Sequence, residues 1–114
     1  MTIEEMKNRF CYKIKVYLRD PETGEPTEEY IILREPNSTE LAKLTDNEQE
    51  NNKIIMAIMP NCIVDSSITD ETGNKVKNKQ ISDIIMSTTT LATDVMNDWL
   101  KACPFSSRKR NEEN

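Results

Sequence analysis

"LREPNSTEL", residues 33–41, marks a change in the spacing of the apolar side chains. Before this stretch they alternate every second residue, as in a strand, and after it they recur as in a helix. Pro36 favours an extended residue before it and ends strand pairing. Asn37, with Ser38 as the competing residue, can cap a helix, and Glu40 completes the spacing of a capping box. The stretch therefore predicts a strand, a turn and a helix start.

The residues on the N-terminal side of this stretch predict a β-hairpin. Residues 10–19 alternate, and one face of that strand is expected to hold Phe10, Tyr12, Ile14, Val16 and Leu18. "DPETGE", residues 20–25, predicts a reversal, and residues 27–34 form the returning strand. Ahead of the hairpin, Thr2 and Glu5 have capping-box spacing, which indicates either a short helix or a frayed end.

The residues on the C-terminal side predict helices. A first apolar stripe, expected to stop at Pro60 and Asn61, comprises Ile54, Ile55, Ile58 and Met59. Residues 80–101 predict two helices or one bent helix, because the hydroxyl-rich run 87–90 weakens a helix interior. The stripes there comprise Ile81, Ile84 and Ile85, and then Leu91, Val95 and Trp99, of which Trp99 is the candidate core anchor.

Together these patterns predict the α+β class, with an N-terminal antiparallel β-hairpin packed on three to four α-helices in a single small domain. A length of 114 residues supports one modest core. We divide the chain into an N-terminal segment (1–9), a globular domain (10–104) and a disordered tail (105–114), with Pro104 ending the fold.

Charge and composition exclude several classes of partner. The formal net charge is -5, from 20 acidic against 15 basic residues, so nucleic-acid binding is unlikely. No apolar run approaches the roughly 20 residues that span a membrane. The acidic N-terminus lacks an apolar signal core, and three widely spaced cysteines favour reduced thiols. We therefore expect a cytoplasmic protein with no membrane association.

The residue types and their spacing do not indicate a catalytic site. The chain has no histidine, which excludes Ser-His and Cys-His nucleophile pairs, although lysine or carboxylate bases remain possible. The cysteines lack the close pairs of a metal site, and two glycines cannot build a phosphate-binding loop. A solvated turn explains Asp65, Asp70 and Glu71 better than a calcium loop does. We expect no enzyme and no catalytic, cofactor-binding or metal-binding residues.

Six methionines are the remaining unusual feature. Methionine side chains are flexible and polarisable, and they recur on surfaces that adapt to helical partners. Most of them are expected in the core, but one exposed groove could hold a partner helix. The candidate partner-binding residues are Ile55, Met56, Met59, Met86 and Met96. In this interpretation Met59 is exposed.

Three motifs in this order resemble the tail assembly chaperones of long-tailed bacteriophages and prophages. They are "LREPNSTEL" (33–41), "IMPNCIVD" (58–65) and "STTTLATDVMNDWLKACP" (87–104), and the resemblance covers most of residues 28–104. The residues that carry it are Leu33, Arg34, Pro36, Glu40, Leu41, Pro60, Cys62, Ile63, Leu91, Val95, Trp99 and Pro104.

The resemblance implies a non-enzymatic role in virion assembly. Members of this family bind the tape measure protein, a long helical client, and keep it soluble until tail-tube subunits polymerise around it. The resemblance also implies weak homo-oligomerisation along the client, a location in the bacterial host cytoplasm, and in many members a longer frameshifted product.

Two other interpretations stay open at this point. The first is a small structural phage protein, such as a head-tail connector or a minor tail component, which would remain in the finished virion. The second is a bacterial regulatory or adaptor domain. If that domain bound nucleic acid, its binding would weaken steeply as salt rises, whereas helix binding in an apolar groove would not.

Overall fold

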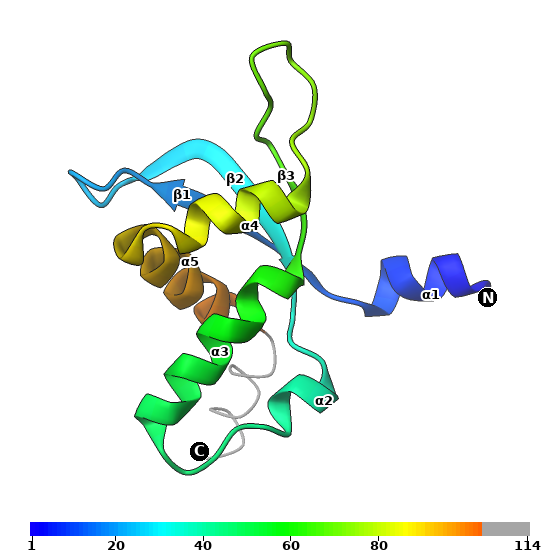
Figure 1. Ribbon diagram of the computed structural model, residues 1–114. Coiled ribbons are helices and arrows are strands. Elements are labelled where there is room, and N and C mark those ends of the chain that lie inside the picture. Colours follow the sequence, from blue (N-terminus) through cyan, green and yellow to red (C-terminus); the bar gives the residue numbers. More distant parts are fainter. Residues whose placement is uncertain (104–114) are drawn as a thin grey trace.

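The computed structural model describes residues 1–103, which form a small α+β fold of one three-stranded antiparallel sheet and five helices (Figure 1). The elements in chain order are α1 (Ile3–Phe10), β1 (Lys13–Arg19), β2 (Pro26–Arg34), α2 (Ser38–Leu41), α3 (Glu48–Cys62), β3 (Ile63–Ser66), α4 (Asn78–Met86) and α5 (Thr89–Ala102). The predicted fold class is confirmed. The predicted end at Pro104 and the tail 105–114 lie outside the described residues.

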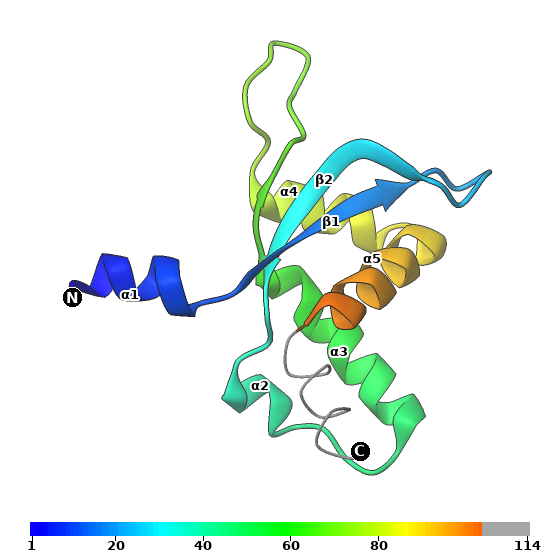
Figure 2. The ribbon, with the colours of Figure 1, turned by 180° about the vertical axis from the view of Figure 1, so that it is seen from behind.

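The sheet has the order β1-β2-β3, and one of its faces is buried under helices. Ile14 pairs with Leu33 and Val16 with Ile31, and all four side chains are almost fully buried. Alternation in the strands places them on one face, as the sequence predicts. Figures 1 and 2, seen from opposite sides, show α4 and α5 on this face and open space over the other.

The hairpin begins three residues later than its alternation predicts. Phe10 and Tyr12 were expected on the buried face, but Phe10 ends α1 and is 60% exposed, and Tyr12 is also exposed. The error arises because a short helix and a strand both tolerate apolar residues two apart. The reversal itself is confirmed, since Gly24 has a φ of 74° and Asp20 N–H donates to the Glu25 carbonyl at 2.9 Å.

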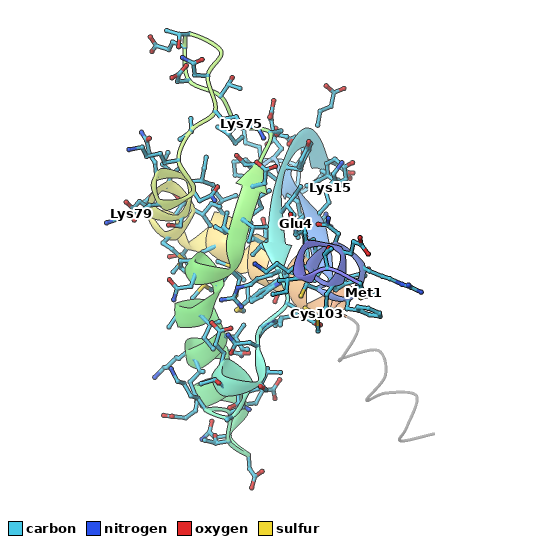
Figure 3. All side chains as sticks on the ribbon, turned by 90° about the vertical axis from the view of Figure 1, so that its right-hand side faces the viewer. Met1, Glu4, Lys15, Lys75, Lys79 and Cys103 are labelled. Atoms are coloured by element: carbon cyan, nitrogen blue, oxygen red, sulfur yellow. The ribbon has the colours of Figure 1, made fainter. Side chains whose placement is uncertain are left out.

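The sequence left two possibilities for the N-terminal residues, a short helix or a frayed end, and in the structure they form a helix. The Thr2 hydroxyl accepts a hydrogen bond from the Glu5 N–H at 3.1 Å, as the capping spacing indicates. None of the residues of α1 is buried. Figure 3 views this helix end-on, with Met1 and Glu4 labelled, and Figure 1 shows it projecting from the body.

The stretch that decides the fold forms the predicted joint between β2 and α2. Asn37 Oδ1 accepts from the Glu40 N–H at 2.8 Å, and Glu40 Oε1 accepts from the Asn37 N–H at 2.9 Å, which confirms the capping box. Arg34 donates to the two Glu40 oxygens at 2.8 and 3.2 Å. This hydrogen bonding lowers the pKa of Glu40. The joint is therefore fixed by charge as well as by capping.

Helix α3 does not stop where the sequence predicts. It continues through Pro60 to Cys62 and leads directly into β3. Proline lacks the N–H that would bond to the Met56 carbonyl, and its ring crowds that carbonyl. Pro60 lies only two residues before the end of α3, so few helical residues follow this disturbance.

The break between the last two helices is confirmed. α4 ends at Met86, and the Ser87 hydroxyl donates to the Ile84 carbonyl at 2.6 Å, which competes with helix continuation. Ile81 and Ile85 enter the core, but Ile84 is 57% exposed and does not belong to the buried stripe as expected. Trp99 is fully buried and donates its indole N–H to the Arg34 carbonyl at 3.1 Å, which confirms it as a core anchor.

Candidate functional site

An open apolar groove of about 530 Å³ lies between α3 and α5, beside the end of α4. We call it the methionine groove, and its lining residues are Asn52, Lys53, Met56, Ala57, Met86, Thr93 and Met96. Three of the five predicted partner-binding residues, Met56, Met86 and Met96, are thus brought together by three different helices.

Helical spacing explains how each wall is built. On α3, Lys53, Met56 and Ala57 are three and four residues apart and share one face. On α5, Thr93 and Met96 are also three apart. Met86 is the last residue of α4, so the turn at residues 87–88 decides where it lies. The groove therefore depends on packing of helices that are far apart in sequence.

The other two candidates lie in the core. Met59 is fully buried and Ile55 is 5% exposed, so the expectation that Met59 is available to a partner is wrong. Both residues belong to the buried core cluster, because the apolar stripe of α3 turns toward the helices it packs against, α4 and α5. Sequence spacing alone could not separate Met56, which lines the groove, from Ile55 and Met59, which lie in the core.

The three methionines of the groove differ in accessibility. Met86 is 39% exposed, Met56 is half-buried and Met96 is 7% exposed. Met96 thus forms the floor and Met86 the accessible edge. Because methionine has several rotatable bonds, these side chains can adjust to differently shaped apolar partners.

Lys53 is the charged side chain of the groove, and residues 1–103 supply no acidic group to its lining. The rim otherwise carries Asn52 and Thr93, which are neutral hydrogen-bonding groups. Such a lining can bury apolar side chains and orient an acidic partner residue near Lys53. It offers no paired acid and base for proton transfer.

The two buried thiols, Cys62 and Cys103, are also unsuited to nucleophilic chemistry. Burial raises the pKa of Cys62 to about 11 and that of Cys103 to about 12, and Cys11 is exposed. Since the thiolate is the nucleophile, the two buried groups are poorly reactive at neutral pH. Cys62 and Cys103 are small core residues.

The open face of the sheet forms a second exposed surface. Lys15 Nζ lies 4.2 Å from the ring centre of Tyr30 and 5.8 Å from that of Tyr17, and the two rings meet edge-on. Lys15 and Lys75 are labelled on this side in Figure 3, and Lys75 is held by Asp65 at 2.9 Å. Cation–π contacts thus engage Lys15, and an ion pair engages Lys75.

The remaining polar clusters are structural. Asp70 accepts hydrogen bonds from the Thr72 N–H and hydroxyl and from the Asn74 N–H, and these bonds, that of Thr72 first, lower its pKa. The predicted turn is therefore closed by its own side chains. Within residues 1–103 the structure assembles no cluster of metal-ligating side chains. Across the same residues, no helix combines the length and the apolar character needed to cross a membrane.

Sequence reasoning missed the small and polar lining residues Asn52, Lys53, Ala57 and Thr93. The available signal was their helical spacing from Met56 and Met96. It was overlooked because alanine, asparagine and threonine are also ordinary residues of a solvated helix face.

No family model matches this chain, and no curated protein or solved structure is significantly similar to it.

Proposed function

We propose that this protein is a tail assembly chaperone of the phage type, which binds the helical tape measure protein and keeps it soluble during tail assembly. The observation that carries the proposal is the open methionine groove of about 530 Å³, in which Met56, Met86 and Met96 supply an apolar lining. The order of the three sequence motifs supports the same class.

The groove suits a long helical client because the contact is apolar and adaptable. A client helix presents apolar residues three and four apart, and these fit between two parallel ridges of a groove. A tape measure protein carries many such segments, so repeated weak contacts gain strength through avidity and still release when tube subunits compete. The net charge of -5 keeps the covered client soluble.

The proposal includes a location in the bacterial host cytoplasm and no catalytic activity. The alternative is a small structural component of the virion, such as a head-tail connector or minor tail protein. The two functions differ in the finished particle, since a chaperone leaves before assembly ends. Mass spectrometry of purified virions therefore separates them.

The direct test is co-expression with the large helical protein encoded just downstream, followed by pull-down and native mass determination. We expect a soluble complex that carries several copies of the chain. A client that stays insoluble in the presence of the wild-type chain would overturn the proposal.

Variants of the groove make the test specific. Met86→Lys introduces a charge at the accessible edge and should remove client solubilisation. Val64→Lys is the matched control, because Val64 is 38% exposed on β3 and lies outside the groove. Equal loss of the client in both variants would mean that the groove is not the binding site. Rising salt should leave client binding intact, whereas it would abolish binding to nucleic acid.

A further inference from the structure

Helix α1 has an apolar stripe that nothing in the described chain covers. Ile3, Met6 and Phe10, spaced three and four residues apart, are 75%, 56% and 60% exposed. Isolated helices of fewer than about 12 residues are marginal in water, and α1 has 8. Its helical form therefore needs a surface on which this stripe can be buried.

The charges beside the stripe show what kind of surface fits. Successive residues turn about 100° around a helix, so Lys7 and Arg9 border the stripe while Glu4 and Glu5 lie toward the opposite side. The Arg9 guanidinium carbon lies 5.3 Å from the ring centre of Phe10, which keeps this cation at the edge of the stripe. The complementary surface is apolar and has an acidic border.

A second groove of the same chain meets this description. It has a volume of about 520 Å³ and lies between α4 and the loop formed by residues 67–77. We call it the loop groove, and its apolar side chains include Ile68, Val76, Ile81 and Ile84. The charged residues among its described lining are Asp70 and Glu71, both acidic. The methionine groove, by contrast, carries Lys53, which would repel the cations of α1.

The groove is poorly placed to receive α1 of its own chain. α1 is joined by residues 11–12 to the end of β1 where Lys13 pairs with Arg34. The loop starts beyond Ser66, which pairs with Ile31 on β2. Ile31 is three residues from Arg34, so the start of the loop and the end of α1 are separated by about 10 Å along the sheet. Figures 1 and 2 show α1 projecting away from α4 and from the loop.

We propose that α1 of one copy of this protein docks in the loop groove of a second copy, with Ile3, Met6 and Phe10 against Ile84 and its apolar neighbours. Lys7 and Arg9 then face the acidic border at Asp70 and Glu71. Exchange of both helices gives a reciprocal dimer with two-fold symmetry, in which each contact occurs twice. The methionine groove of each copy stays open, so this inference does not depend on what that groove binds.

The test measures self-association of the full chain by analytical ultracentrifugation. Met6→Lys should raise the dimer Kd about a hundredfold or more, because each of two equivalent contacts loses at least about tenfold. Asn8→Lys is the matched control, since it adds the same charge to the opposite side of α1 and should leave the Kd unchanged. Met6 and Ile84 are 56% and 57% exposed, so substitution at either should not disturb folding.

Complementation identifies the two surfaces. Met6→Lys has a defective helix and an intact groove, and Ile84→Lys has the reverse, so each alone should be monomeric. An equimolar mixture should form a heterodimer through the one intact contact. Glu71→Lys should also weaken the dimer, because it places a cation against Lys7 and Arg9. A mixture that stays monomeric would overturn the pairing.

Two results would overturn the dimer itself. The first is a wild-type chain that remains monomeric at the highest soluble concentration. The second is a monomeric wild-type chain whose α1 resists protease but becomes sensitive in the Met6→Lys variant. That result would mean that the stripe of α1 packs on its own chain. Neither result bears on client solubilisation by the methionine groove, which Met86→Lys tests separately.

Discussion

Replacement of Trp99 by alanine should lower the free energy of unfolding more than any other single substitution predicted for this protein. The side chain is fully buried, and its indole N–H donates to the Arg34 carbonyl at 3.1 Å. Large-to-small replacement of a buried aromatic residue costs about 3–5 kcal/mol, and loss of the donor to the part-buried Arg34 carbonyl adds up to about 1–3 kcal/mol. Because the two terms overlap, we expect a total of about 4–6 kcal/mol. Small domains are stable by about 5–15 kcal/mol, so this variant should be close to unfolding.

Trp99→Phe separates the two contributions. Phenylalanine keeps most of the apolar volume but lacks the donor, so the Arg34 carbonyl loses its partner. We expect a loss of about 1–3 kcal/mol, well below that of Trp99→Ala. Tyr12→Ala is the control for removal of an aromatic ring, since Tyr12 is 49% exposed and should cost about 1 kcal/mol or less.

Urea unfolding followed by far-UV circular dichroism is the suitable assay. Trp99 is the single tryptophan of the chain, so its variants cannot be followed by tryptophan fluorescence. The slope of the free energy against urea should be similar in all variants if they unfold in two states. A loss below about 2 kcal/mol for Trp99→Ala would refute the assignment of Trp99 as the core anchor.

Two further predictions concern titratable groups. The pKa of Glu40 is lowered by Arg34 from the ordinary 4.5, so the ion pair contributes its full stability above that pH and loses it as pH falls through the lower folded value. Glu40→Gln should therefore cost about 1 kcal/mol at neutral pH and progressively less in acid, as measured by urea unfolding across pH. A thiol reagent should modify only Cys11 in the native protein, whereas Cys62 and Cys103 should react after unfolding; rapid native labelling of either would contradict their burial.

The sequence is most informative where local chemistry determines the backbone. The cap at Asn37 with Glu40, the reversal at Gly24 and the helix break at Ser87 each follow from side chains that act within a few residues. Such features are predictable because no distant contact is needed to form them.

The sequence is less informative where the burial of a side chain depends on elements that are distant in the chain. Ile84 and Ile85 are adjacent and chemically identical, yet Ile84 is 57% exposed and Ile85 is 2% exposed. Met56 and Met59 divide between groove and core in the same way, because packing against the distant helices α4 and α5 decides which side of α3 is covered. Likewise, the alternation over residues 10–19 could not reveal that Phe10 belongs to a helix and that β1 begins only at Lys13.

The packing of α5 on β1 has a consequence for how the chain folds as it is made. Arg19 and Asp98, 79 residues apart, are joined at 2.7 Å, and the Trp99 indole reaches back 65 residues to Arg34. A ribosome that adds about 5–20 residues per second needs about 4–16 s to make that intervening stretch. During this interval the apolar face of the nascent hairpin lacks the cover that α5 provides on β1. The domain can therefore close its core only after α5 has emerged, and resistance to proteases should appear late and all at once.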